Sequence, residues 1–466
     1  MKFKNTRRTI SYHINNDFRK YAIYTLQSRG IPAFDDSLTT VQRIILKNAK
    51  VNLEKTLSLL GSCMSDGYNH GDNSLAGAIA KITRDFNCSE NLLEGKGFWG
   101  TPVVHEAAAP RYTSVKMKND IKQEYLKYSY LDHKVDDTWQ PLYMDIPIGL
   151  ANMTTGIAVG YRSIILPRKL SDIKRFLDGN LKTVKPYFKN FKGKVLKHKE
   201  SGGWIITGSY QVDEGTKTIH IDDVPHIIKY PSFMAKLIRA LDASEINYTM
   251  LNDSAEKVDV KIKCNKVEEL TRLTEIVDKN LKILVKESIV FIKDTSVITY
   301  KNIEDYLTDY KIRIKELEWK DNEYKFNVES FNLEYEKAKL KFLLFMTEKK
   351  RTRDEVTKFL KQFNNKISSK LDSIKLTKLN KETIEETKEE IKRLEKLVKD
   401  YTKKLKDSKK EYEKMFESFK FTGNITGADN SLFEDEEPQE YNGITVFQLN
   451  DNDEVDEVMD EEIETI

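Results

Sequence analysis

The sequence predicts an α+β multidomain protein in which a helical part, a mixed part and a long antiparallel coiled coil follow one another. A chain of 466 residues exceeds what one hydrophobic core usually organises, so about two to four domains are expected. Hydrophobic residues make up 39% of the chain, which is enough for buried cores. The apolar pattern changes near residue 131 and again near residue 302, and these changes mark the expected boundaries.

The first part, residues 1–130, has the pattern of helices broken by Gly, Asn and Asp turns. A helix is expected over 74–86, after the turn at residues 70–72, with Asp72 or Asn73 as its N-cap. A helix that follows a glycine turn is compatible with a helix-turn-helix or winged-helix DNA-binding domain.

The second part, residues 131–300, is expected to mix strands with helices. It begins near a Gly- and Thr-rich segment, 147–163, which we expect to be a loop and strand close to the first part. Short apolar or alternating runs predict the strands. These runs are 203–210, 216–224, 258–264 and 287–293.

The third part, residues 301–422, carries two apolar seams with spacings of three and four residues, which is the pattern of a coiled coil. The seams run from Tyr310 to Phe345 and from Ile384 to Phe419, with polar Thr387 and Ser408 at two positions of the second. A basic segment between them predicts a small helical tip at about 347–380. By itself such a hairpin could be a dimerisation rod or a spacer. A tip that self-associates would close a twofold dimer around a cavity.

Charge is segregated along the chain. Residues 423–466 hold 15 Asp and Glu and no Lys or Arg, and we expect this acidic tail to be disordered. The rest of the chain therefore has 77 basic and 59 acidic residues, the 74 of the whole chain less the 15 of the tail. A basic body of this kind attracts a polyanion such as nucleic acid, although a merely soluble, lysine-rich surface is the alternative. The tail could mimic DNA, dock a partner or simply solubilise the chain.

Several classes of protein are disfavoured. No apolar stretch approaches the roughly 20 residues of a membrane span, and the N-terminus lacks the apolar core of a signal peptide. The three cysteines, Cys63, Cys88 and Cys264, form no metal-ligand pattern and are expected to be reduced, buried thiols. These features favour a cytoplasmic protein, in the host-cell cytoplasm if a phage encodes it, with no membrane partner and no metal site of its own.

Tyr112 follows Arg111 in the string AAAPRYT. A tyrosine hydroxyl can attack a phosphodiester and become esterified to it. Its pKa near 10 means that it needs positive charge nearby to react at neutral pH, and an arginine can hold a nonbridging phosphate oxygen through two donors. An Arg-Tyr pair alone is usually structural, so the surrounding strings decide its meaning.

Those strings resemble the breakage-reunion region of the cleavage (A-type) subunit of type IIA DNA topoisomerases. The similarity covers GYNHGDNS (67–74), LLEGKGFWG (92–100) and AAAPRYT (107–113), with SRGIPAFDDSLTTVQRIIL (28–46) before them and NMTTGIAVGY (152–161) after them. Within the family, the variants at 41–43 and 160–161 are similar to those of the T-even-type phage branch. The resemblance implies a winged-helix DNA-binding domain, an α+β tower domain and a coiled coil that forms a dimer gate.

The resemblance also implies roles for single residues. Tyr112 would be the nucleophile and Arg111 would steady the scissile phosphate. Arg29, Arg43 and His70 would contact the DNA backbone, and His70 could assist proton movement. Ile157 would wedge between base pairs and bend the DNA. Without the family, His70 could simply hold a turn, Arg43 could lie on a helix surface and Ile157 could belong to a core.

The implied function is that of the cleavage and religation subunit of an ATP-dependent type II DNA topoisomerase, an isomerase that forms a transient 5′-phosphotyrosyl bond in double-stranded DNA and passes a second duplex. Mg²⁺ and ATP are expected to be bound mainly by a separate ATPase and metal-binding subunit, because no phosphate loop and no ordered carboxylate cluster is present. A homodimer is expected through the tip. The alternatives are a non-catalytic, DNA-bridging architectural protein and a tyrosine nuclease or recombinase of another fold.

Five positions depart from the family pattern. A lysine-proline pair is replaced by Thr39 and Thr40, a turn histidine by Tyr68, a helix histidine by Gln42 and a helix arginine by Ile44. The change at Thr39 removes an expected phosphate contact, while none of the five changes affects the residues assigned to cleavage, Tyr112 and Arg111.

Overall fold

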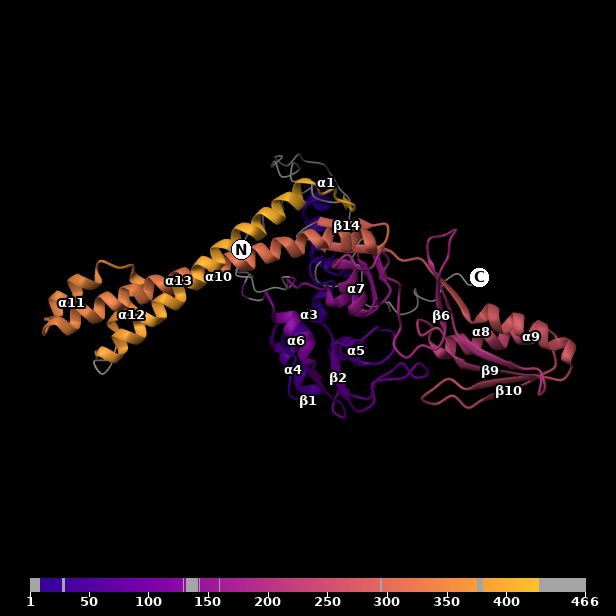
Figure 1. Ribbon diagram of the computed structural model, residues 1–466. Coiled ribbons are helices and arrows are strands. Elements are labelled where there is room, and N and C mark those ends of the chain that lie inside the picture. The colour runs from indigo at the N-terminus through magenta and orange to yellow at the C-terminus, as the bar shows by residue number, and fades with distance from the viewer. Residues whose placement is uncertain are drawn as a thin grey trace, which may run out of the picture. The chain divides into compact units, whose positions relative to one another are not determined.

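The computed structural model describes residues 9–26, 30–128, 130, 141, 143–158, 160–293, 296–374 and 380–426. These residues form two compact units. The described part of the larger unit runs to Tyr310 and resumes at Thr422, and the smaller unit comprises Tyr130 and residues 311–421 as far as they are described. The larger unit therefore holds both the helical part and the mixed part that the sequence predicts (Figure 1).

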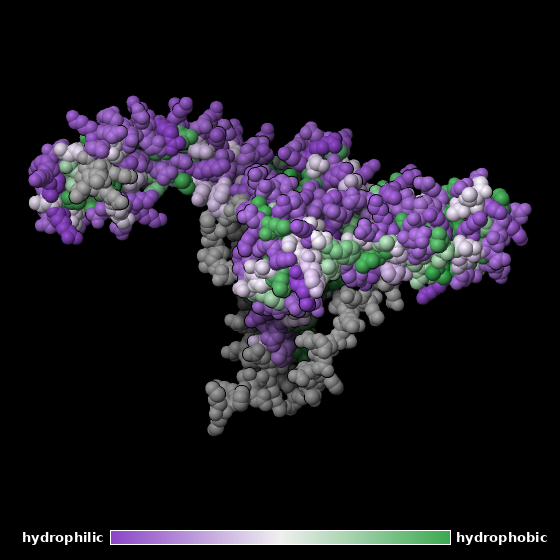
Figure 2. All heavy atoms as spheres, turned by 90° about the horizontal axis from the view of Figure 1, so that it is seen from below, coloured by the Kyte–Doolittle hydropathy of each residue, from purple (hydrophilic) through white to green (hydrophobic). Residues whose placement is uncertain are grey.

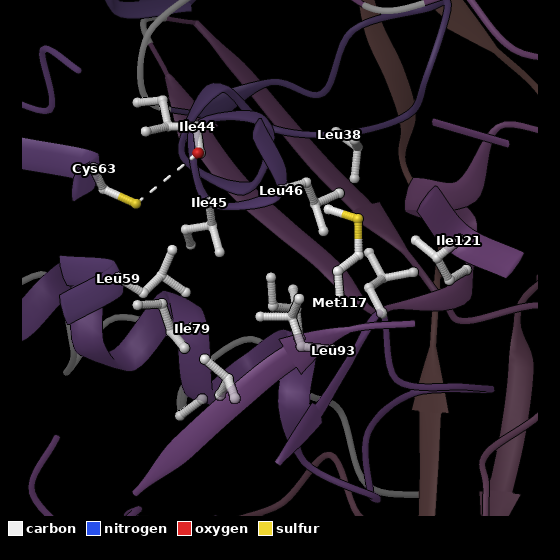
Figure 3. Packing of buried hydrophobic residues seen from close by; sticks show 14 of the residues in the cluster. Leu38, Ile44, Ile45, Leu46, Leu59, Cys63, Ile79, Leu93, Met117 and Ile121 are labelled. Carbon is white, nitrogen blue, oxygen red and sulfur yellow. Dashed lines mark hydrogen bonds between the residues drawn. The ribbon is translucent and has the colours of Figure 1, made fainter. Parts of the chain in front are cut away.

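The first core of the larger unit combines helices with a small sheet. Helices α3 (Thr40–Asn48), α4 (Thr56–Ser65) and α5 (Asp72–Thr83) pack on one another. Strands β1 (Glu54–Lys55), β3 (Ser114–Met117) and β2 (Leu93–Lys96) form an antiparallel sheet in that order. Figure 3 shows how their apolar side chains converge, with the Cys63 thiol directed at the Ile44 carbonyl 3.9 Å away.

Two boundaries of the first part differ from expectation. Helix α5 begins at Asp72 with Gly71 as its N-cap, and it ends at Thr83 because Arg84 adopts an extended backbone. The first core also takes in Met144, Ile148 and Ala151, which lie beyond the predicted boundary at residue 130.

The second core belongs to the mixed part. Strands β10 (Tyr248–Asn252), β11 (Val260–Cys264), β9 (Thr218–Asp223) and β8 (Ser209–Asp213) form an antiparallel sheet in that order. Helices α8 (Tyr230–Asp242) and α9 (Val267–Asn280) lie against it (Figure 1), and alternate strand residues such as Ile219 and Ile262 are buried. Each of the four predicted strand runs contains an observed strand.

Further small sheets complete the mixed part. Strands β12 (Lys282–Val285), β7 (Trp204–Thr207) and β6 (Lys194–Lys197) form one sheet in that order, and β4 (Thr154–Ala158) and β5 (Tyr161–Ile165) form a hairpin.

The remaining helices of the larger unit are α1 (Ile10–Tyr12), the π-helix η1 (His13–Phe18), α2 (Arg19–Thr25), α6 (Asn119–Leu126), the 3₁₀ helix η3 (Ile148–Ala151) and α7 (Leu170–Leu177).

Another three-stranded sheet corrects the prediction for the start of the tail. Strands β13 (Ile289–Lys293), β14 (Ser296–Tyr300) and β15 (Asn424–Thr426) are antiparallel neighbours in that order. Just before β15, the Thr422 hydroxyl donates to the Asp309 carboxylate at 3.0 Å. Backbone pairing and this bond order residues that the acidic composition assigns to a disordered tail. The tail from residue 427 onward lies outside the described residues.

The smaller unit contains two long antiparallel helices, most of α10 (Ile303–Glu348) and all of α13 (Lys381–Glu417). Residues later in α10 contact residues earlier in α13, as an out-and-back topology requires. The contacts are an ion pair between Lys315 and Glu411 (3.0 Å), stacking of Trp319 on Tyr412 (5.4 Å), a hydrogen bond from Asn322 to Ser408 (3.1 Å) and an ion pair between Lys337 and Glu395 (2.7 Å).

The polar seam residues are satisfied within this unit. Ser408 is buried and accepts the hydrogen bond from the Asn322 amide on the facing helix. Thr387, also buried, donates its hydroxyl to the Thr383 carbonyl one turn earlier at 2.7 Å. A buried polar group that finds a partner costs little stability and helps to select one register between helices.

Two short helices, α11 (Arg353–Leu360) and α12 (Asn365–Asp372), occupy the segment predicted as a tip. Ile367 and Leu371 of α12 form a small core with Ala338 and Phe342 of α10, which holds α12 against the end of the long helix. Both short helices begin with side-chain caps, from Thr352 and from Asn364.

The surface is mainly polar, as Figure 2 shows for one face, where hydrophobic side chains form only scattered patches. Within the described part of the chain, no helix combines the length and the apolar character needed to cross a bilayer. All three cysteines are free and buried, as predicted.

Candidate active site

Tyr112 lies at the end of a turn formed by residues 110–112, directly before β3. Its backbone N–H donates to the Ala109 carbonyl at 2.9 Å, which closes the turn. The side chain is 71% exposed, so the hydroxyl is accessible to a large ligand. A tyrosine with a core or structural role is usually buried. The high exposure of Tyr112 therefore argues against such a role.

The residue after Tyr112 holds this turn to the first core. Thr113 is completely buried, and its hydroxyl donates to the Thr56 hydroxyl at 2.8 Å, while the Thr56 N–H donates to the Thr113 carbonyl at 3.2 Å. Gly97 lies behind the turn at φ +109°, where a Cβ would come within 3.3 Å of the Tyr112 carbonyl oxygen. Only glycine adopts that backbone conformation readily, so Gly97 permits the close approach.

Arg111 is exposed beside Tyr112, with its guanidinium carbon 5.7 Å from the centre of the tyrosine ring. Lys96 is a second exposed cation nearby, because its strand position on β2 pairs with Ser114, two residues after Tyr112. The sequence prediction included Arg111 and missed Lys96, although Lys96 belongs to the GKG string that identified the region. The two cations make the surroundings of Tyr112 suited to a phosphate.

Ile157 is 53% exposed near the end of β4, opposite Arg162 on β5. The hairpin packs tightly on the loop before α3, because a Cβ on Gly156 would come within 1.7 Å of the Gly30 carbonyl oxygen. The two glycines therefore let the backbones touch and fix the base of the hairpin. Exposure excludes the alternative in which Ile157 is a core residue.

His70 is half-buried in the turn before α5, and its ring packs edge-on against the ring of Tyr68 with centres 5.5 Å apart. Tyr68 is 6% exposed and joins the first core. This departure from the family pattern thus supplies a buried ring that orients His70.

Arg43 does not have the environment that a DNA contact requires. Its side chain is 7% exposed and forms a two-point ion pair with the fully buried Asp36, from Nε to Oδ2 at 2.7 Å and from Nη2 to Oδ1 at 3.1 Å. Nη2 also donates to the Leu38 carbonyl at 3.1 Å. The geometry argues against the predicted contact with DNA and gives Arg43 the task of holding the loop 36–38.

Two other departures from the family pattern act together at the start of α3. Thr39 is the N-cap, and the Gln42 side chain accepts a hydrogen bond from the Thr39 N–H at 2.9 Å, as part of a capping box. Thr39 and Gln42 therefore stabilise the helix that carries Arg43.

The structure brings some of the predicted site residues together. Arg111 and Tyr112 are adjacent, and the turn that holds them rests on the same core as Tyr68, the packing partner of His70. Ile157 belongs to a separate hairpin, Arg43 is buried, and Arg29 lies outside the described residues. Among the described residues, no group of three or more His, Cys, Asp or Glu side chains is arranged to hold a metal ion.

Residues 29–420 match the family model for the A-type subunit of DNA gyrase/topoisomerase IV. Since this match covers most of the 466 residues, the chain belongs to that family of DNA gyrase and topoisomerase IV subunits. The resemblance of its motifs to the T-even-type phage branch agrees with its similarity to a phage T4 protein.

A DNA topoisomerase medium subunit of Enterobacteria phage T4 is 31% identical over 245 residues, which are 49% of this chain and 54% of that protein. The A-type subunit of DNA topoisomerase 4 from Staphylococcus epidermidis is 26% identical over 264 residues, 48% of this chain and 32% of that protein. The chain thus spans about half or less of the length of these relatives.

The fold is similar to that of a solved structure described as the Plasmodium falciparum topoisomerase II DNA-binding, cleavage and re-ligation domain. The TM-score is 0.68 at 20% sequence identity, and the match covers 87% of this chain and 65% of the other. At this level of identity the comparison establishes a shared fold.

Proposed function

We propose that this chain is the DNA-cleavage and religation subunit of a type II DNA topoisomerase, with Tyr112 as the nucleophile. The observation that carries the proposal is the 71% exposed Tyr112 on a turn held rigidly by Thr113 and Thr56, with Arg111 beside it. Membership of the gyrase and topoisomerase IV family supports the same reaction.

In the proposed reaction the Tyr112 hydroxyl oxygen attacks the phosphorus of a DNA phosphodiester. A bond forms between Oη and phosphorus, the bond to the 3′ oxygen breaks, and that oxygen leaves with a proton. The product is a 5′-phosphotyrosyl ester and a free 3′ hydroxyl. Religation is the reverse attack by the 3′ hydroxyl, so the energy of the phosphodiester is conserved and no hydrolysis is needed for resealing.

Arg111 and Lys96 are proposed to bind the nonbridging oxygens of that phosphate, which gain negative charge during the attack. His70, oriented by the Tyr68 ring, is proposed to contact the DNA backbone or to move a proton. Arg29 remains a proposed backbone contact on the strength of the family pattern alone.

A partner subunit is proposed to supply Mg²⁺ and ATP hydrolysis. A divalent metal stabilises the attacking or leaving oxygen of a phosphoryl transfer. The T4 and staphylococcal relatives are both described as single subunits of a topoisomerase, and such names fit a protein that works with other chains.

The parts of the fold can be assigned tasks on this basis. We propose that the first core, with α5 behind its glycine turn, is a winged-helix domain that binds double-stranded DNA, and that the part built on the second core is a tower domain. The antiparallel helices and their tip are proposed to pair with a second copy of the chain, so that two tyrosines cut opposite strands and a gate opens between them.

The proposal is tested by mixing the chain with a purified ATPase partner, Mg²⁺ and supercoiled plasmid, and by quenching the reaction with detergent. The expected result is plasmid linearised with protein attached to both 5′ ends, and relaxation that depends on ATP. Compaction or bridging of plasmid without any covalent adduct would support the architectural alternative instead.

Replacement of Ile157 by alanine should reduce DNA bending and slow cleavage, although the proposed nucleophile Tyr112 is retained. An exposed apolar side chain beside a duplex can enter between base pairs and unstack them. We expect a smaller bend angle by fluorescence energy transfer across a short duplex, and cleavage slowed by about 10-fold or more. A matched control is Leu196→Ala, which removes an equally exposed side chain on β6. Equal bending by wild type and Ile157→Ala would argue against the wedge.

A further inference from the structure

The chain reaches Tyr112 through a compact loop, residues 99–108. Gly100 turns at φ +90°, where a Cβ would come within 2.8 Å of the His105 carbonyl oxygen. The Thr101 hydroxyl accepts a hydrogen bond from the Val104 N–H at 3.0 Å, and the Thr101 N–H donates to the Val104 carbonyl at 2.7 Å. The Ala108 N–H donates to the Phe98 carbonyl at 3.0 Å, which closes the loop four residues before Tyr112.

Two side chains fasten this loop to other parts of the larger unit. Val103 packs against the second core, which is formed by β9, β11, α8 and α9. The His105 ring lies 5.1 Å from the buried Phe86 ring, and Phe86 in turn contacts His226, a 3% exposed residue that follows β9. The loop before Tyr112 is thus attached to the mixed part as well as to the first core.

Ring packing against Phe86 and a hydrogen bond to the Pro102 backbone hold the His105 side chain. Its Nε2 is buried without a hydrogen-bond partner among the described residues, and the Arg84 guanidinium lies over the Phe86 ring at 4.5 Å. Burial, aided by the positive charge of Arg84 and by His226, lowers the pKa of His105 to about 4, while the neighbouring Glu106 and the hydrogen bond to the Pro102 backbone act in the opposite direction. The ring is therefore neutral at pH 7 and can pack against the Phe86 ring without burying a charge.

We propose that Val103 and His105 are positioning residues for Tyr112, which anchor the loop 99–108 to Phe86 and the second core and so set where the chain enters the turn 110–112. Thr113 and Thr56 hold the turn from one side, and the loop holds it from the other. The inference rests on the proposed role of Tyr112 as nucleophile. An attacking oxygen must lie about 3 Å from phosphorus in line with the leaving group, and a displacement of about 1 Å can slow such a reaction about 100-fold.

The test compares His105→Ala and Val103→Ala with wild type in the complex with the ATPase partner and Mg²⁺. Both variants are expected to cleave DNA about 10 to 100 times more slowly, with a Kd for DNA within about twofold, because neither side chain is proposed to touch DNA. Hydrogen exchange of the chain alone should be faster at the Ala108 and Tyr112 amides, whose bonds close the loop and the turn.

Two further variants separate positioning from other roles. His105→Phe keeps a ring against Phe86 and is expected to cleave within about threefold of wild type. Val104→Ala, on the same loop but 41% exposed, should match wild type in every readout. If His105→Phe is as slow as His105→Ala, or if Val103→Ala and His105→Ala leave cleavage and exchange unchanged, the proposal is wrong. Two results can also separate the anchor from the nucleophile. If His105→Ala and Val103→Ala exchange faster as free chains, but wild type forms no covalent adduct with the ATPase partner and Mg²⁺, the anchor is supported and the proposed nucleophile is contradicted.

A pH series gives an independent readout. Because the folded pKa of His105 lies below the usual value near 6.5, its neutral ring contributes stability that is fully present above pH 6.5 and is lost as pH falls toward 4. The Tm of His105→Phe should therefore fall less than that of wild type over this interval. An identical decline in both proteins would mean that the ring is not buried in neutral form and would overturn the anchor.

Discussion

Replacement of Tyr112 by phenylalanine is expected to lower DNA cleavage by at least about 1,000-fold. The change removes the hydroxyl oxygen that the proposed reaction joins to phosphorus. The neighbouring hydroxyls of Thr113 and Thr56 are buried and bonded to each other, so they do not replace it. DNA affinity should be unchanged within about twofold, because phosphate binding is assigned to Arg111 and Lys96. The measurements are detergent-trapped covalent adduct and Kd at one fixed salt concentration.

The stability of Tyr112→Phe should also be close to that of wild type, within about 0.5 kcal/mol, because the exposed ring packs on little. The control is Tyr187→Phe, since Tyr187 is 38% exposed and has the Lys169 ammonium 3.8 Å from its ring centre. It reproduces an exposed tyrosine beside a cation but lies outside the turn. Full cleavage by Tyr112→Phe would show that another group is the nucleophile.

Local patterns carried the prediction of the long helices. Spacings of three and four residues along 310–345 and 384–419 require only that apolar side chains fall on one face. The first segment is helical throughout and the second as far as Glu417, so the predicted seam overran the helix at Phe419. The polar Ser408 could be recognised as an irregularity in the seam. Its partner Asn322 could not, because nothing local links two residues 86 positions apart.

Long-range contacts explain the parts that the sequence did not predict. Loop 34–38 contains Asp35 and Asp36, which are buried although aspartate is usually exposed. In the structure, Tyr306 donates to the Phe34 carbonyl at 2.8 Å and Tyr310 donates to the Asp35 carbonyl at 2.7 Å, both from helix α10. Tyrosines about 270 positions later in the chain therefore bury the loop, and this burial also encloses Arg43.

The candidate site was predictable to the extent that its chemistry lies in short strings. Tyr112, Arg111 and Ile157 belong to such strings, and their exposure agrees with the roles assigned to them. The supports of the site, such as Thr56 under Thr113 or Phe86 under His105, come from other segments. Thr and Phe at those positions are unremarkable in sequence, so only the folded chain identifies them.

Replacement of Arg43 by methionine is expected to lower the apparent free energy of unfolding of the larger unit by about 3–5 kcal/mol. The substitution keeps most of the side-chain volume but leaves the fully buried Asp36 carboxylate without its cation. The Leu38 carbonyl also loses a donor. The measurement is denaturant unfolding, followed by a signal from the larger unit. The double variant Asp36→Leu with Arg43→Met should recover much of the loss, because a buried pair costs less when both charges are removed.

The same variants decide between the two roles considered for Arg43. The control Lys47→Met removes an ion pair on the same helix, with Asp66, in which the lysine side chain is 62% exposed, and should change stability by less than about 1 kcal/mol. If Arg43 contacted DNA, its replacement would instead leave stability intact and weaken DNA binding. The slope of log Kd against log salt concentration would also fall by the amount expected for one phosphate contact. Because the guanidinium is already bonded to Asp36 and Leu38, we expect the loss of stability and an unchanged salt slope for the fraction that remains folded.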